Sequence, residues 1–170
     1  MAKVDIVLDA DVIIHFSKAD CLSLLPTIFP EYRMVVLSVV YDELKGEIKL
    51  QLDNMSNLLK TIETIPFNPQ KDMKLEYARL LSRFGKGESA CMAYCRYTNN
   101  VIGSSNLRDI KAYCEQHQLV YLTTIDFLYY AIKRGKMTIE EANLFVDTVL
   151  KKGSKLPETD FNTFISHVML

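Results

Sequence analysis

The stretch Val4–Phe16, VDIVLDADVIIHF, constrains the fold of this chain more than any other. The run Ile6–Leu8 is short and aliphatic, which is typical of a strand buried on both faces of a parallel sheet. Asp9 follows at once, at the carboxyl end of this strand, and an apolar helix begins soon after it. Ligands of open α/β sheets bind at that edge, so Asp9 is a candidate functional residue. The alternative interpretation is that Asp9 only caps the helix.

Strand and helix patterns alternate along most of the chain. Further strands are predicted at residues 33–37, 61–66, 101–105 and 119–122, with helical patterns between them. Such alternation favours parallel strands with helices on both faces. The predicted fold is therefore a three-layer α/β/α sandwich with a central, mainly parallel sheet of four to five strands.

The 170 residues suffice for one α/β domain, which we predict over residues 1–155. We predict a separate amphipathic helix within residues 156–170. Phe161, Phe164, Ile165 and Val168 follow the i, i+3, i+4, i+7 spacing of an amphipathic helix. We expect this helix to pack on its own domain or on a partner.

Composition limits the classes of function. The net charge of −1 gives no overall basic field, so binding of nucleic acid would depend on a local patch or a metal ion. The longest apolar run, Met34 to Tyr41, is far too short to span a membrane. The four cysteines lack the paired spacing of a structural zinc site. We expect a cytoplasmic protein with reduced thiols and no membrane partner.

Two further acids are expected near Asp9. Glu43 lies in the helix that follows the second strand, and Glu88 opens a helix after the glycine-rich turn at residues 85–87. A carboxylate at a helix amino terminus is stabilised whatever its role, so Glu88 alone has a purely structural alternative. Together, the three positions predict that Asp9, Glu43 and Glu88 converge at one edge of the sheet.

Converging carboxylates need a counter-charge. Two like charges about 4 Å apart repel by about 4 kcal/mol at an effective dielectric near 20. A divalent cation removes this conflict, and ligands that are all oxygen favour Mg²⁺ or Mn²⁺. Such an ion can generate a hydroxide and hold a phosphodiester for in-line attack.

These motifs resemble those of the PIN-domain family of metal-dependent nucleases. LDADVIIHF matches the first motif, with Asp9 as the acid and Asp11 in the supporting polar position. SVVYDEL supplies Glu43 and GKGESACMAY supplies Glu88. The resemblance implies a ribonuclease in which Asp9, Glu43 and Glu88 are catalytic and bind Mg²⁺ or Mn²⁺, with RNA as the substrate. It also implies a toxin of a toxin–antitoxin pair, an antitoxin protein as partner, and a homodimer.

The chain departs from the family where a fourth acid usually follows the next strand. Ser104, Ser105 and Asn106 stand there, and we expect them to support the site by hydrogen bonds. Asp109, one helical turn later, is the candidate substitute metal ligand. The alternative is that Asp109 is a surface residue paired with Lys111 or Arg108. Lys86 and Arg108 are candidate phosphate contacts.

The sequence is compatible with two other functions. The spacing of Asp9 and Asp11 is also similar to the first motif of haloacid-dehalogenase-like phosphatases, but that family needs a late acidic pair where this chain has VIGSSN. The other alternative is a PIN-like module with a degenerate site that binds RNA or protein without cleaving it.

Overall fold

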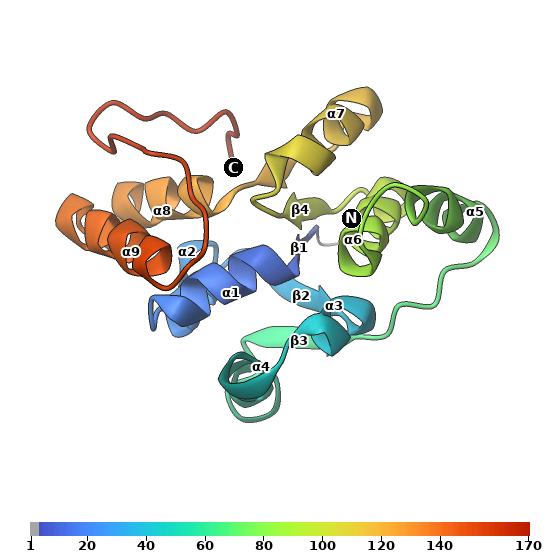
Figure 1. Cartoon of the computed structure of the whole chain (residues 1–170), viewed down its shortest axis with the longest axis horizontal. Coiled ribbons are helices and arrows are strands. Elements are labelled where there is room, and N and C mark those ends of the chain that lie inside the picture. The colour runs from blue at the N-terminus through green and yellow to red at the C-terminus, as the bar shows by residue number, and fades with distance from the viewer. Residues whose placement is uncertain (1–3) are drawn as a thin grey trace.

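The computed structural model describes residues 4–170 and shows a five-stranded sheet flanked by helices (Figure 1). The strands are β1 (Asp5–Leu8), β2 (Arg33–Leu37), β3 (Ile62–Ile65), β4 (Val101–Gly103) and β5 (Tyr121–Leu122). Their order in the sheet is β3-β2-β1-β4-β5, and every neighbouring pair is parallel. The predicted α/β sandwich is confirmed. All carboxyl ends of the strands therefore meet at one edge.

Helices connect the strands, as parallel pairing requires. They are α1 (Ala10–Lys18), α2 (Leu25–Ile28), α3 (Ser38–Glu43), α4 (Gly46–Asp53), α5 (Lys71–Leu80), α6 (Lys86–Thr98), α7 (Leu107–His117), α8 (Thr124–Lys133) and α9 (Ile139–Lys151), with a 3-10 turn at Leu22–Leu24 and a π-helical turn at Asn54–Leu58. Within residues 4–170, no helix combines the length and apolar character needed to cross a bilayer.

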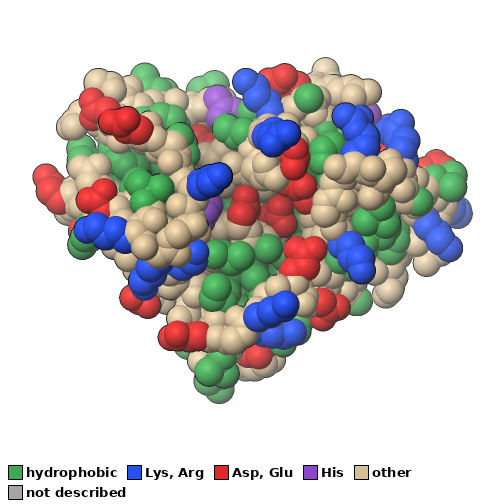
Figure 2. Space-filling model, viewed as in Figure 1, with side chains coloured by type: hydrophobic (Ala, Val, Ile, Leu, Met, Phe, Trp, Pro, Cys, Tyr) green, Lys and Arg blue, Asp and Glu red, His purple; other side chains and the backbone are tan. Residues whose placement is uncertain are grey.

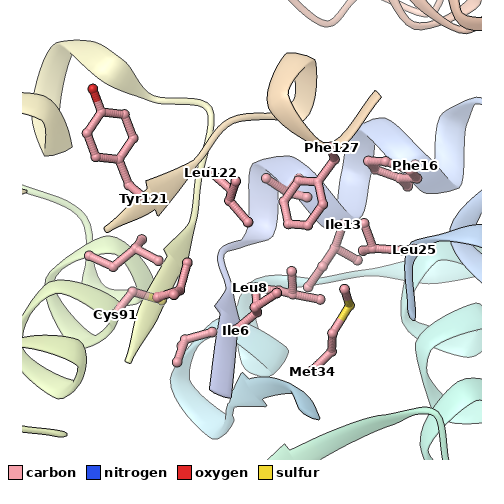
Figure 3. Packing of buried hydrophobic residues seen from close by; sticks show 14 of the residues in the cluster. Ile6, Leu8, Ile13, Phe16, Leu25, Met34, Cys91, Tyr121, Leu122 and Phe127 are labelled. Carbon is pink, nitrogen blue, oxygen red and sulfur yellow. The ribbon is translucent and has the colours of Figure 1, made fainter. Parts of the chain in front are cut away.

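Aromatic rings from α1 and α8 pack on one face of the central strand β1. Leu8 of β1 lies among Ile13 and Phe16 of α1 and Phe127 of α8 (Figure 3). The rings of Phe16 and Phe127 meet edge to face, with 6.1 Å between their centroids. Each of these side chains is fully buried. This packing fixes the start of α1 against the end of β1 and so fixes the position of Asp9.

Strand β4 can lie close to β1 because it ends in a glycine. A Cβ atom on Gly103 would stand 3.0 Å from Leu8 Cδ2 and 3.4 Å from Phe127. The backbone N–H of Asp9 donates to the carbonyl of Gly103 at 2.8 Å. The residues that follow β1 and β4 are therefore held side by side.

The prediction of an amphipathic helix within residues 156–170 is wrong. This segment has only a turn near Phe161 and is otherwise irregular. Ser166 donates a hydrogen bond from its hydroxyl to Asp126 of α8 at 2.7 Å, and Ile165, expected on the buried face, is 77% exposed. The Ser166 hydroxyl oxygen also accepts from the backbone N–H of Val168 at 3.2 Å, and local side-chain–backbone bonds of this kind compete with helix formation. The segment lies over α8, so it packs on its own domain, but not as a helix (Figure 1).

Candidate functional site

Asp9 stands at the carboxyl end of β1 and is 6% exposed. Its Oδ1 accepts a hydrogen bond from the backbone N–H of Ala10 at 2.8 Å, so it does cap α1. Its Oδ2 accepts a second bond from the hydroxyl of Ser104 at 3.1 Å. One oxygen thus serves the helix, while the other faces the end of β4. The two interpretations of Asp9 are therefore compatible.

Asp11 fixes the loop that follows β4. Its Oδ2 accepts from the backbone N–H of Ser105 at 2.8 Å and from the Ser104 hydroxyl at 3.4 Å. Its Oδ1 accepts from the N–H of Val12 at 2.7 Å. Asp11 therefore holds both serines of the loop beside Asp9.

Asn106 joins the acids of α6 and α7. Its Nδ2 donates to Glu88 Oε1 at 2.6 Å and to Asp109 Oδ2 at 2.8 Å. The structure therefore brings Asp109 beside Glu88, as a substitute acid would require. The side chain of Asn106 makes no capping bond to α7, although the residue stands at the N-cap position. We call Asp9, Asp11, Glu88 and Asp109 the acid cluster.

Glu43 approaches the same region from the end of α3. Its Oε1 accepts from the backbone N–H of Gly87 at 2.7 Å, in the first turn of α6. A Cβ atom on Gly87 would stand only 2.8 Å from Glu43 Oε2, so this contact needs a glycine. Sequence reasoning missed this role of Gly87; the only indication was its place directly before Glu88.

The two predicted phosphate contacts lie at the rim. Lys86 opens α6 and Arg108 lies in the first turn of α7, and both are exposed. Neither forms an ion pair with another residue in the range 4–170. Figure 2 shows acidic side chains gathered near the centre of one face, with Lys and Arg side chains around them. The structure leaves both cations free to meet an anionic ligand.

Burial and mutual repulsion raise the pKa values of the acids in the cluster. Burial, together with the charges of Asp11 and Glu88, raises the pKa of Asp9 to about 8. Burial, followed by the charge of Asp109, raises the pKa of Glu88 to about 7. Burial also raises the pKa of Asp11. The cluster therefore holds protons near neutral pH unless a cation compensates its charge.

The acids at this edge of the sheet offer oxygen donors for a divalent cation. In the part of the chain that the structure describes, no three Asp, Glu, His or Cys side chains are gathered in an arrangement ready to hold an ion. The chemistry of the donors nevertheless fits, because all are carboxylate oxygens: Asp9 is buried, Glu88 and Asp109 are half-buried, and Glu43 is exposed. Burial, and after it the charges of neighbouring carboxylates, raises the pKa values of Asp9 and Glu88, and a bound cation would offset both effects. The residues thus fit Mg²⁺ or Mn²⁺ in kind and charge, and Asn106 now occupies the space between two of them.

A polar network lies behind the cluster and was not predicted. The Ser105 hydroxyl donates to Thr124 Oγ1 at 2.7 Å, and His15 Nδ1 lies 2.8 Å from the same atom. Burial, with a smaller effect of Lys18, lowers the pKa of His15 to about 4, so the ring is neutral near pH 7. The sequence offered one indication: His15 lies four residues after Asp11, on the same face of α1.

The fold and the site define a class: an α/β protein whose parallel sheet carries buried carboxylates at its carboxyl edge. The DUF3368 family model, described as a PIN domain, matches residues 5–169. The chain therefore belongs to the PIN-domain family, and the resemblance is confirmed.

A solved structure, that of VapBC-1 from nontypeable Haemophilus influenzae, has the same fold. It superposes with a TM-score of 0.51 at 15% sequence identity, and the match covers 72% of this chain and 99% of that one. No curated protein matches the chain.

Proposed function

We propose that this protein is a metal-dependent ribonuclease that cleaves RNA phosphodiester bonds. One observation carries the proposal: Ser104 links Asp9 to Asp11, and Asn106 links Glu88 to Asp109. The backbone N–H of Asn106 also donates to the Ser104 hydroxyl at 3.4 Å, so the two pairs lie next to each other at one sheet edge. Membership of the PIN-domain family supports the same chemistry. We further propose that the protein is cytoplasmic and acts as the toxin of a toxin–antitoxin pair.

In this proposal Asp9, Glu43, Glu88 and Asp109 hold Mg²⁺ or Mn²⁺. The bound ion supplies Lewis acidity toward a phosphate oxygen and lowers the pKa of a water molecule. Asn106 takes part by turning its amide, because its Oδ1 can ligate a cation whereas its Nδ2 cannot.

The other residues of the site orient and attract the substrate. Asp11 keeps the backbone at Ser105 in place through its 2.8 Å hydrogen bond, and Ser104 keeps its hydroxyl on Asp9. Lys86 and Arg108 bind phosphate oxygens of the RNA from the exposed rim. Because the protein carries a net charge of −1, these local cations rather than an overall basic field attract the RNA.

The decisive experiment is RNA cleavage with Mg²⁺ or Mn²⁺ by the wild type and by Asp9→Asn and Glu88→Gln. Both substitutions keep the size of the side chain and remove its charge. Asp147→Asn is the matched control, because Asp147 is an exposed acid in α9, away from the site. We expect cleavage by the wild type and the control, and a loss of at least about a hundredfold in the other two variants. Equal activity in all four proteins would contradict the proposal.

The degenerate binding module is the second candidate, because the described residues hold no ready cation site and an amide stands where the family usually has an acid. It predicts that the wild type and Asp9→Asn bind RNA equally and that neither cleaves it. A phosphatase of the haloacid-dehalogenase type is not supported, because β4 is followed by Ser104, Ser105 and Asn106 rather than by an acidic pair.

The proposed partners are an antitoxin protein and a second copy of the chain. Size-exclusion chromatography with light scattering tests the homodimer directly. For the antitoxin, the measurement is inhibition: the product of a neighbouring gene, added at an equimolar amount, should abolish cleavage. Cleavage that persists with the bound product present would reject that product as the antitoxin.

A further inference from the structure

A pocket with a volume of about 490 Å³ opens between β5, the first turns of α7 and α8, and the carboxyl-terminal segment. We call it the tail pocket. Ser105 belongs both to its lining and to the site, because its backbone N–H donates to Asp11 at 2.8 Å. Ser105 therefore lies between the acid cluster and the tail pocket, which makes the two sites neighbours.

The inner wall of the tail pocket is aromatic. The ring of His167 lies over that of Tyr121, with 4.5 Å between the centroids and 37° between the planes. The side chain of His167 is 46% exposed, whereas Tyr121 beneath it is buried. The ring of Tyr121 points away from the other labelled core side chains (Figure 3). His167 thus offers one covered face and one face that a second flat ring can stack on.

The wall is held rigidly by the carboxyl-terminal segment. Ser166, next to His167, bonds through its hydroxyl to the buried carboxylate of Asp126 at 2.7 Å. Two residues further on, the carbonyl of Val168 accepts from the hydroxyl of Tyr130. A stacking surface that is already ordered binds without paying the entropy of immobilisation.

The rim provides one anion and one cation for recognition. Glu158 makes no hydrogen bond or ion pair to any residue between 4 and 170, whereas the carboxylates of Asp126 and Asp160 accept bonds from their own neighbours. Lys111 also lines the pocket; its side chain is 56% exposed and forms only a long, exposed ion pair with Glu115, at 3.9 Å. A free carboxylate accepts hydrogen bonds from N–H groups, and an exposed ammonium attracts phosphate.

We propose that the tail pocket holds the nucleobase of the RNA nucleotide next to the cleaved bond, and that it prefers guanine. This inference rests on the proposed ribonuclease function. RNA is read chiefly through unpaired bases that stack on aromatic side chains, which matches His167. Guanine presents two adjacent N–H donors, which match the two oxygens of Glu158. The volume is that of a pocket for one small ligand, and Lys111 meets the adjoining phosphate.

The first test measures binding without cleavage. Guanosine and uridine are titrated separately by calorimetry into the full chain of each protein without metal ions, and the His167 ring resonances are also followed by NMR in the proteins that keep His167. We expect guanosine to bind more tightly than uridine. His167→Ala should weaken guanosine binding about tenfold, the loss expected for one stacked base. Glu158→Gln should remove the preference for guanosine, whereas Ile165→Ala, which changes an exposed residue of the same segment, should bind like the wild type.

Either of two results overturns the inference: guanosine leaves the His167 resonances unchanged, or His167→Ala and Ile165→Ala bind guanosine equally. A second assay separates this inference from the proposed function. RNA cleavage with the same base preference in wild type and His167→Ala would keep the nuclease and reject the tail pocket. Selective guanosine binding in a protein that cleaves no RNA would keep the pocket and reject the nuclease.

Discussion

Substitution of Asn106 by aspartate is the most informative perturbation of the acid cluster. In the wild type, Nδ2 of Asn106 donates to Glu88 at 2.6 Å and to Asp109 at 2.8 Å. Asn106→Asp removes both hydrogen bonds to charged acceptors, each with a contribution of about 1.5–3 kcal/mol. It also places a third carboxylate between two existing ones. Without metal ions, the protein should therefore become less stable, and with them it should gain an anionic ligand.

Protonation of the new carboxyl group limits the loss of stability, because its O–H can again donate to one of the two neighbouring acids. Keeping the new carboxyl group neutral at pH 7 costs about 4 kcal/mol, since its ordinary pKa is about 3.9 and each pH unit corresponds to 1.36 kcal/mol. At pH 5 the same cost is about 1.5 kcal/mol. The raised pKa of Glu88, about 7, shows that this site already disfavours charge. We therefore expect Asn106→Asp to lower the free energy of unfolding by about 3–6 kcal/mol at pH 7 in EDTA, because two hydrogen bonds are lost, and by less at pH 5, where the new carboxyl group is more easily protonated.

The assay is urea denaturation at both pH values, in EDTA and in Mn²⁺, together with calorimetric titration of Mn²⁺. Asn162→Asp is the matched control, because the Nδ2 of Asn162 also donates to a carboxylate, that of Asp160 at 2.9 Å, but on the exposed surface. Mn²⁺ should stabilise Asn106→Asp more than the wild type, as mass action requires for tighter binding. Equal Mn²⁺ affinity in the wild type and Asn106→Asp would refute the reasoning and place this side chain outside the metal site.

Three further predictions concern Asp109, Gly87 and His15. Asp109→Asn should lower the pKa of Glu88 from about 7, because it removes the nearest like charge; carboxyl NMR titration measures this shift. Gly87→Ala should weaken Mn²⁺ binding by displacing the glutamate at the end of α3, while Gly85→Ala, which meets no atom within 4 Å, should not. Because the pKa of folded His15 is lowered to about 4, the unfolded state takes up its proton first. The free energy of unfolding of the wild type should therefore fall by up to about 3 kcal/mol as the pH drops below about 6.5. His15→Gln should lack this part of the acid loss when denaturation curves are compared at pH 7, 5 and 4.

The strands and the gathering of acids could be predicted because both depend on local sequence and a general rule. The run Ile6–Leu8 is apolar throughout, as a central parallel strand requires, and it pairs with β2 on one side and β4 on the other. Parallel pairing then sends every carboxyl end to one edge, which is enough to bring Asp9 near the loop after β4. No knowledge of side-chain packing is needed for this step.

The finer contacts of the site could not be predicted, because each joins residues far apart in the chain through a single atom. The bond from Gly87 to Glu43 spans 44 residues, and the bond from Ser105 to Asp11 spans 94. The spacing of apolar residues along the sequence does not predict such pairs. The same holds for His15 and Thr124, which meet across 109 residues. These contacts decide how the acids are oriented, so the sequence locates the site but leaves its geometry undetermined.

The failed prediction of a carboxyl-terminal helix and the existence of the tail pocket have one physical cause. Helical spacing would bury Ile165 together with Phe161 and Val168, but the buried carboxylate of Asp126 accepts a bond from Ser166 instead. A hydrogen bond to a buried charge contributes about 1.5–3 kcal/mol, which competes with the burial of one isoleucine. Ser166 therefore faces the domain, Ile165 turns to solvent, and His167 is brought over Tyr121. Ser166→Ala should therefore release His167 from its stacked position as well as lower stability, because the contact that prevents the helix is also the one that builds the pocket wall.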